Sequence, residues 1–228
     1  MSAISRIKSV SAGVLAGLLA VAAQGQGTFQ NLDFESAVPM PVPGGLPGTV
    51  QFAPAFPGWA CTVNGRAESS ALHDNLSVTP ALALFGPSSG APQGNYCAVF
   101  QSAALFLPVE VSLFQSGTVP VDALSLQFVG TSPSAVGAGS FGVSLNGSPL
   151  NLSVLQDDGL HALYGGDVSG FAGQAAELRF QQVVNPTGSG LFTLDAIQFS
   201  PTPVPEPGTW SLLALGGALF WMARRRKG

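Results

Sequence analysis

Charged residues are scarce in this chain, and positive charge is almost absent from its middle. Only 9% of the 228 residues are Asp, Glu, Lys or Arg. Six of the eight basic residues lie near the two ends, so only Arg66 and Arg179 stand among the eleven carboxylates from Asp33 to Asp195. Proteins that bind nucleic-acid backbones need clustered Lys and Arg. This distribution therefore argues against nucleic acid as a partner.

Residues suited to a catalytic or zinc centre are also few. Gly86-Pro87-Ser88-Ser89-Gly90 matches the G-x-S-x-G pattern of serine hydrolases, and Asp157 and His161 follow it in hydrolase order. A nucleophile elbow needs a helix after the serine, whereas further Pro and Gly residues and a new strand follow Ser88. His73, the other histidine, has no Cys or His near it at a zinc-ligand spacing. We interpret the serine segment as a surface turn.

Glycine and proline are abundant instead. The chain contains 29 Gly and 18 Pro, and 46% of it is hydrophobic, which favours short strands joined by tight turns over disorder. Apolar residues alternate at 105–113, 124–128 and 141–145, and no stretch of the middle keeps a helical period. The pattern predicts an all-β fold, a single β-sandwich domain over residues 24–201.

Turn residues place the later strands. Asn146-Gly147 predicts a hairpin turn that leads into a strand at 150–155, because Asn and Gly accept positive φ. The last strand, expected at 191–199, has apolar residues at both odd and even positions. Such a strand is typical of the centre of a sheet, or of one covered on both sides.

The N-terminal segment has the features of a secretion signal. Arg6 and Lys8 precede a short apolar run of small residues, and Val21 and Ala23 suit a cleavage site. A membrane anchor is the alternative, but the run is shorter than the roughly 20 residues of a spanning helix. We expect residues 1–23 to be a signal peptide.

The C-terminal segment has three parts in a fixed order. Val204, Pro205, Glu206 and Pro207 come first, an apolar stretch at 209–223 follows, and a basic cluster ends the segment with Arg224, Arg225, Arg226 and Lys227. The Arg cluster should stay on the cytoplasmic side of a short transmembrane helix, so the body should lie outside. The fourteen residues from Trp210 to Ala223 would span only about 21 Å as a helix, less than the roughly 30 Å hydrocarbon core, so this would be a weak anchor.

These features closely resemble the PEP-CTERM sorting signal of bacteria, over residues 202–228. The resemblance implies recognition of the Pro-Glu-Pro motif by an exosortase, a membrane peptidase that releases the body or transfers it to an acceptor. The motif would then be a substrate and not a catalytic site. It also implies a membrane-anchored precursor and a final place at the surface or outside a Gram-negative-type cell; a permanent tail anchor is the alternative.

The body also resembles galactose-binding-like jelly rolls, the architecture of many carbohydrate-binding modules. The resemblance is carried by segments 31–35, 56–59, 164–180 and 194–199. In such domains the first and last strands often hold a structural calcium ion, which here implies Asp33, Glu35 and Asp195 as ligands. Ordinary solvated carboxylates, or an ion pair of Glu35 with one of the two arginines of the body, are the alternative.

Aromatic platforms for sugars are few. Trp59, Tyr96 and Tyr164 are the only Trp and Tyr residues before the tail. Trp59 follows Pro57-Gly58 at the expected start of a strand, a position typical of a core residue. Tyr96 and Tyr164 are therefore the candidate ligand contacts.

Cys61 and Cys97 are the only cysteines, and both lie in the part expected to be exported. An oxidising compartment favours a disulfide between them over two buried free thiols. Closing a loop of about 37 residues would stabilise the fold by roughly 3 to 4 kcal/mol if loop entropy dominates.

Taken together, the sequence predicts a non-enzymatic exported protein of the surface or extracellular matrix, processed by an exosortase and associated with exopolysaccharide. A lectin similar to a carbohydrate-binding module, with a real ligand groove, is the first alternative. A hydrolase is the least favoured reading, because no catalytic constellation is evident.

Overall fold

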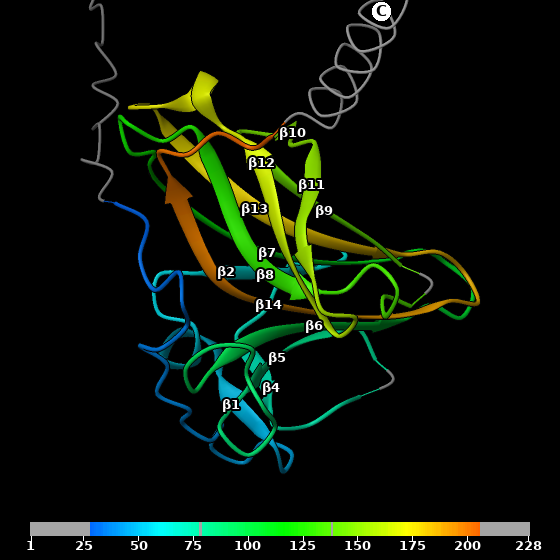
Figure 1. Ribbon diagram of the computed structural model, residues 1–228. Helices are drawn as coiled ribbons and strands as arrows, with labels where there is room; N and C mark the ends of the chain where they lie inside the picture. The colour runs from blue at the N-terminus through cyan, green and yellow to red at the C-terminus, as the bar shows by residue number, and fades with distance from the viewer. Residues whose placement is uncertain (1–27, 78, 138, 206–228) are drawn as a thin grey trace, which may run out of the picture.

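Two β-sheets packed face to face form the body of the protein (Figure 1). The computed structural model describes residues 28–77, 79–137 and 139–205. The expected signal peptide and the expected transmembrane helix lie outside these ranges. Within them the chain is almost entirely strand and turn, so the all-β sandwich predicted from the alternating pattern is confirmed. No helix in the described ranges is long and apolar enough to cross a membrane.

The larger sheet has eight strands, and all its neighbours are antiparallel except the parallel pair β4–β5. In spatial order the strands are β1 (Thr49–Gln51), β4 (Ser70–His73), β5 (Ala81–Phe85), β6 (Cys97–Ala103), β14 (Ser189–Ser200), β8 (Ser125–Thr131), β12 (His161–Asp167) and β11 (Leu152–Asp157).

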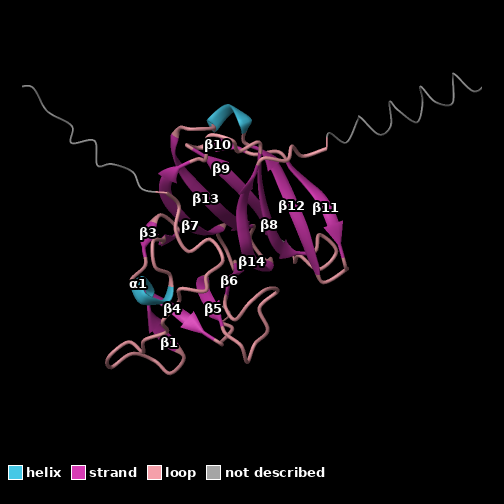
Figure 2. Ribbon diagram, turned by 60° about the vertical axis from the view of Figure 1, so that its left-hand side comes forward, coloured by secondary structure: helices cyan, strands magenta, loops and turns pink. Residues whose placement is uncertain are grey.

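The smaller sheet has six antiparallel strands. In spatial order they are β10 (Ser148–Pro149), β9 (Gly139–Leu145), β13 (Ala175–Val184), β7 (Val109–Thr118), β2 (Ala60–Val63) and β3 (Arg66–Ala67). A single helical turn, α1 (Phe52–Ala55), follows β1, and a 3-10 turn, η1 (Ser169–Phe171), follows β12 (Figure 2).

The core between the sheets is rich in aromatic rings. Phe141 of β9 stacks on Phe192 of β14 with ring centroids 3.6 Å apart, and Phe128 of β8 meets Phe180 of β13 edge to face at 5.4 Å. Stacked and edge-to-face pairs are the favoured aromatic geometries. Trp59 is also buried, and its indole N–H donates to the Asn31 carbonyl at 3.0 Å, which confirms its assignment to the core.

The final strand is central, as its apolar residues at both parities predict. β14 lies between β6 and β8, and its pairing with β8 shifts between Asp195 and Gln198. Ala196 in this bulge has a φ of 49°, and the Ile197 N–H donates to the Leu32 carbonyl. The bulge therefore changes which side chains face inward and also attaches the first segment of the body.

Two strand predictions need correction. The alternation expected from Leu105 fails because β7 begins only at Val109; Leu105 and Leu107 lie in a turn and are 74% and 75% exposed. Pro108 stands between the turn and the strand and has no N–H for a ladder. The predicted turn at Asn146-Gly147 exists, with φ values of 49° and 75°. However, the strand that returns from this turn is only the short β10. The strand expected at 150–155 is β11, which belongs to the larger sheet.

The predicted disulfide is wrong. Cys61 and Cys97 are both free and buried. Cys61 belongs to the main core between the sheets, whereas Cys97 packs with Ala83 and Val99 in a separate cluster. Burial raises the pKa of each thiol to about 12, so both behave as small apolar side chains.

Candidate functional site

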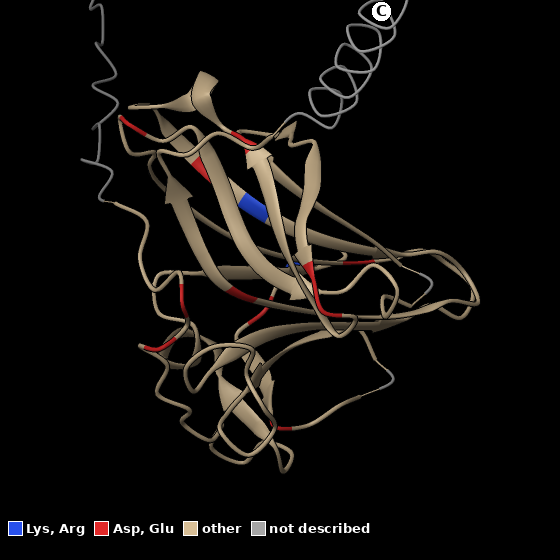
Figure 3. Cartoon of the chain, viewed as in Figure 1, with Lys and Arg blue, Asp and Glu red and all other residues tan. Residues whose placement is uncertain are grey.

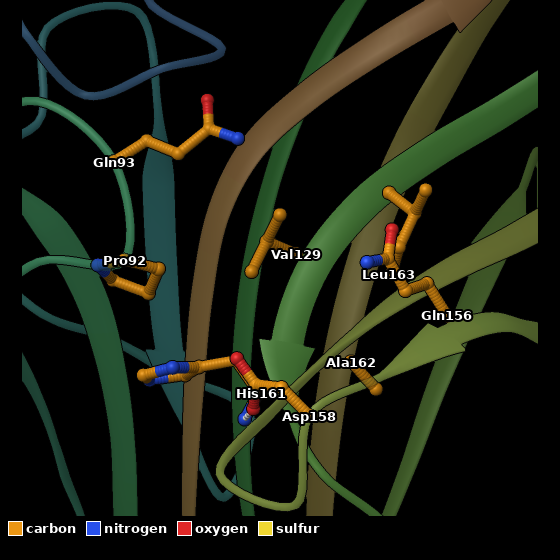
Figure 4. Close-up of a pocket in the computed structure, with 8 residues that line it drawn as sticks. All are labelled: Pro92, Gln93, Val129, Gln156, Asp158, His161, Ala162 and Leu163. Atoms are coloured by element: carbon orange, nitrogen blue, oxygen red, sulfur yellow. Dashed lines mark hydrogen bonds between the residues drawn. The ribbon is translucent and has the colours of Figure 1, made fainter.

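A shallow cavity of about 200 Å³ lies on the outer face of the larger sheet (Figure 4). We call it the outer-face site. Three strands and two loops contribute its lining, namely Pro92, Gln93, Val129, Gln156, Asp158, His161, Ala162 and Leu163. Apolar side chains thus lie among two amides, one carboxylate and one imidazole, a mixture typical of small-ligand sites.

The floor of the outer-face site is fixed by strand register. Gln156 of β11 pairs with Leu163 of β12, and Leu163 pairs with Val129 of β8. Val129 in turn pairs with Asp195 of β14, so one row of residues crosses four strands. Alternation along each strand presents this row to the outer face, opposite the core residues that flank it.

The β11–β12 hairpin supplies one wall of the site. The Asp158 carboxylate accepts hydrogen bonds from the backbone N–H groups of His161 and Leu160 at 2.7 and 2.9 Å. These bonds hold the pKa of Asp158 below its ordinary value. The turn therefore keeps an ionised carboxylate and the His161 ring together at the end of the hairpin, as Figure 4 shows.

The opposite wall is the loop between β5 and β6, and two of the predicted carboxylates hold it in place. Glu35 accepts hydrogen bonds from the backbone N–H of Asn95 at 2.7 Å and of Tyr96 at 2.9 Å, and from the Asn95 side chain. Asp195 accepts one from the Gln93 N–H at 2.9 Å. The sequence grouped these acids as metal ligands; the structure shows that they position a loop.

The buried Asp195 carboxyl has an unusual environment. Burial raises its pKa to about 6; hydrogen bonds from Gln93 and Ala196 oppose this rise, and the charges of Glu35 and Asp33 add to it. Glu35 differs: burial raises its pKa, but the hydrogen bonds from Tyr96 and Asn95 outweigh burial and lower it. Negative charge thus accumulates here, while the two arginines of the described ranges, Arg66 and Arg179, lie on β3 and β13 of the smaller sheet (Figure 3).

Calcium at Asp33, Glu35 and Asp195 stays a prediction. The donor chemistry suits a hard cation, since all three are carboxylates. However, no three Asp, Glu, His or Cys side chains within the described ranges come close enough together to hold a metal ion. As arranged, Glu35 and Asp195 bind backbone N–H groups, and Asp33 accepts a hydrogen bond from the Glu35 N–H at 3.3 Å.

The two tyrosines proposed as ligand contacts differ sharply. Tyr164 is buried, its ring stacks on Phe128 at 5.2 Å, and its hydroxyl donates to the Thr131 carbonyl at 2.7 Å. It belongs to the core, so its prediction as a ligand contact is wrong. Tyr96 is half-buried on the loop that Glu35 holds, and it does not line the outer-face site.

The G-x-S-x-G segment forms a turn between β5 and β6. Ser88 Oγ donates to the Asp74 carboxylate at 2.9 Å, and the same carboxylate accepts from the Gly86 N–H at 2.7 Å. Asp157 instead accepts a hydrogen bond from Ser132 Oγ at 3.0 Å. A serine nucleophile needs a hydrogen bond to a histidine that acts as its base. Ser88 is bonded to a carboxylate instead, so it does not have this arrangement.

Sequence reasoning missed most residues of the outer-face site. The sequence indicates His161 only as part of the rejected hydrolase pattern, and Gln93 and Gln156 carry no signal, because isolated amides are common everywhere. The information lay in tertiary contacts: the β8–β12–β11 order brings Gln156 and His161 together, and the bond to Asp195 brings Gln93 to them. The one local sign was Asp157-Asp158-Gly159, a turn sequence that indicates the β11–β12 hairpin, which forms one wall of the site.

The C-terminal end of the body carries the other functional feature. Residues 203–227 match the PEP-CTERM protein-sorting motif. Val204 and Pro205 lie in the described part of the chain, whereas Glu206, Pro207 and the three arginines at 224–226 lie outside it. The chain therefore carries a PEP-CTERM sorting signal, which marks an exported surface protein processed by an exosortase.

Comparisons with other proteins add little beyond this motif. No curated protein matches the chain. Similar solved structures include CBM27-1 of Caldicellulosiruptor saccharolyticus in complex with mannohexaose, at 15% identity over 57% of this chain and 88% of that one, with a TM-score of 0.39. TmCBM61 in complex with beta-1,4-galactotriose has 12% identity over 77% and 99%, with a TM-score of 0.37. An apo cyclase from Fischerella sp. has 14% identity over 78% and 98%, with a TM-score of 0.42.

Proposed function

We propose that this protein is delivered to the surface or extracellular matrix of a Gram-negative-type cell, where its body associates with exopolysaccharide through the outer-face site. The observation that carries the proposal is the set of planar polar groups, Gln93, Gln156 and His161, around an apolar floor. Amide and imidazole groups can donate to and accept from sugar hydroxyls. A floor of Val129 and Leu163 can cover the apolar face of a neutral sugar.

The charge around the site favours neutral polysaccharides over acidic ones. Asp158 lines the cavity and Asp195 lies one strand beyond its floor. An anionic sugar would be repelled by these carboxylates. The shallow shape and the missing aromatic platform favour weak contacts, which become effective when many copies bind one polymer.

A dedicated lectin is the second candidate. It would require one tight site for a single glycan class, whereas the outer-face site measures only about 200 Å³ and has no aromatic residue in its lining. Classical ligand pockets are larger, on the order of 300 to 1,000 Å³. This observation favours matrix association over high-affinity recognition of one oligosaccharide.

Retention of the purified protein on polysaccharide isolated from the producing bacterium tests the proposal. We expect Gln156→Ala to lower retention about fivefold, since it removes a polar contact of roughly 1 kcal/mol. Gln181→Ala is the matched control, because Gln181 is half-buried on β13 in the other sheet. Equal retention of both variants and the parent protein would reject the outer-face site.

We also propose that calcium binds at Asp33, Glu35 and Asp195 after their side chains move toward one another, since they do not converge on one point as arranged. The support is the group of uncompensated carboxylates, which a divalent cation would neutralise. Calcium would then raise the melting temperature of the parent protein but not that of Asp195→Asn. Magnesium serves as the control, and an unchanged melting temperature in millimolar calcium would contradict the idea.

A further inference from the structure

The segment that leads into the sorting motif is attached to the body. The Leu124 N–H donates to the Ser200 carbonyl at 2.8 Å, and Ser125 Oγ donates to the Thr202 carbonyl at 2.7 Å. The Thr202 N–H donates to Ser200 Oγ at 3.1 Å. After β14 the chain therefore turns across the ends of the adjacent strands instead of leaving the body at once, as Figure 1 shows.

A glycine makes room for the motif's first residues. A Cβ placed on Gly165 of β12 would lie 2.9 Å from Val204 Cγ2 and 2.9 Å from Leu155 Cδ1. Real Cβ atoms do not approach other atoms so closely, so Val204 occupies the space that a side chain at this position would need. The φ of Gly165 is not in the left-handed region. Its lack of a side chain therefore serves packing and not backbone conformation.

The attachment is held on one side only. A cavity of about 340 Å³ lies beside the segment, with Pro203, Val204 and Pro205 on one side and one leucine and four polar residues of the body on the other. The body residues are Leu124, Asn151, Ser153, Asp167 and Ser169. Because this flank is open, the segment can detach without any change in the core between the sheets.

Attachment conflicts with peptidase binding. Peptidases bind substrates as extended strands through backbone groups on both sides of the cleaved bond. Here the Thr202 carbonyl is already bonded to Ser125, and Val204 is packed against Gly165. We propose that residues 202–205 act as a latch: bound to the body, they limit the access of the sorting peptidase, and processing proceeds from the detached state. This inference rests on the sorting motif and is independent of polysaccharide binding.

A large side chain at position 165 would occupy the space of Val204 and so release the latch, which gives the first test. Full-length Gly165→Leu protein, incubated with membranes of the producing bacterium, should lose its tail about fivefold faster than the parent, as expected when contacts worth about one hydrogen bond are lost. Gly142→Leu is the matched control, because nothing lies within 4 Å of a Cβ at Gly142. Ser125→Ala removes the bond to Thr202 and also the 3.2 Å bond that Ser125 Oγ accepts from the Gln127 side chain. It should accelerate processing in the same direction and is available if the leucine variant fails to fold.

A disulfide that holds the segment on the body gives the second test, because it should slow processing. A double variant, Gly165→Cys with Val204→Cys, can form a disulfide between the positions that now touch, whereas the native thiols are buried. Intact mass should show slow processing of the oxidised protein and, after reduction, processing at or above the rate of the parent protein. Faster amide exchange at Thr202 in Gly165→Leu would report detachment directly. Processing of the oxidised protein at the rate of its reduced form would overturn the proposal.

Discussion

The Gln93 N–H and the Asp195 carboxylate, 102 residues apart in sequence, are joined by a 2.9 Å hydrogen bond. Gln93 lines the outer-face site, and Asp195 lies at the bulge of the central strand β14. The bond therefore connects the most buried described carboxyl to the loop between β5 and β6, and it sets the position of one wall of the site. Changes at Asp195 should affect both stability and the site.

Asp195 should make stability decrease as the pH rises from about 4 to about 6. Its folded pKa of about 6 exceeds the ordinary value, so the folded state keeps a proton that the unfolded state has lost. The difference of about two units corresponds to roughly 3 kcal/mol in the free energy of unfolding. Urea unfolding across this pH window should show the decrease in the parent protein and its loss in Asp195→Asn.

Asp122→Asn is the control for that experiment, because Asp122 is an exposed carboxylate in the loop before β8. It should leave the decrease in place. If the parent and Asp195→Asn show the same pH dependence, Asp195 does not titrate in this range and the charge cluster is more solvated than the structure indicates.

Gly94 should tolerate substitution far less well than Gly90. Both glycines have positive φ, 59° and 82°, so an alanine costs backbone strain at each. A Cβ at Gly94 would in addition collide with the Glu35 carboxylate, whereas nothing lies within 4 Å at Gly90. We expect Gly94→Ala to cost about 1 kcal/mol more than Gly90→Ala, because it would disrupt hydrogen bonds of the half-buried Glu35 carboxylate, which contribute on the order of 1 kcal/mol each. Equal unfolding midpoints would show that Glu35 does not hold this loop.

Much of the fold follows from the sequence, because alternation and turn chemistry are local. The central position of β14 could be predicted from its apolar residues at both odd and even positions. The core position of Trp59 could be predicted from the preceding Pro57-Gly58. Sheet membership is not local: β11 joins the larger sheet although it follows a hairpin of the smaller one. The same limit explains the disulfide error, since the sequence does not show that Cys61 and Cys97 lie in different sheets and different clusters.

The site was less predictable than the fold. Asp33, Glu35 and Asp195 lie in one region of the structure, because the first segment and the last strand meet at the Ile197–Leu32 hydrogen bond. Their role as holders of a loop could not be foreseen, since the loop residues bond through backbone N–H groups. Backbone donors exist at nearly every residue and leave no mark in the sequence.

The cysteines should be inert in the folded protein. Both thiols are buried and their pKa values are raised to about 12, so almost no thiolate forms at neutral pH. Alkylation with iodoacetamide should modify neither Cys61 nor Cys97 until urea unfolds the chain, when both should react. Reductant should change neither the intact mass nor the melting temperature. A mass increase of two protons on reduction would restore the disulfide hypothesis.

Removing the hydroxyl should lower the free energy of unfolding at Tyr164 but not at Tyr96. Tyr164→Phe removes the hydroxyl that donates to the Thr131 carbonyl inside the core, so it should cost about 1 kcal/mol of stability and leave polysaccharide retention unchanged. Tyr96→Phe keeps the ring and the backbone N–H that Glu35 accepts, so its stability should stay within about 0.5 kcal/mol of the parent protein. Thermal unfolding and retention of both variants, measured together, separate a core role from a ligand contact. Loss of retention in Tyr164→Phe without loss of stability would return this tyrosine to the ligand site, in conflict with its buried position.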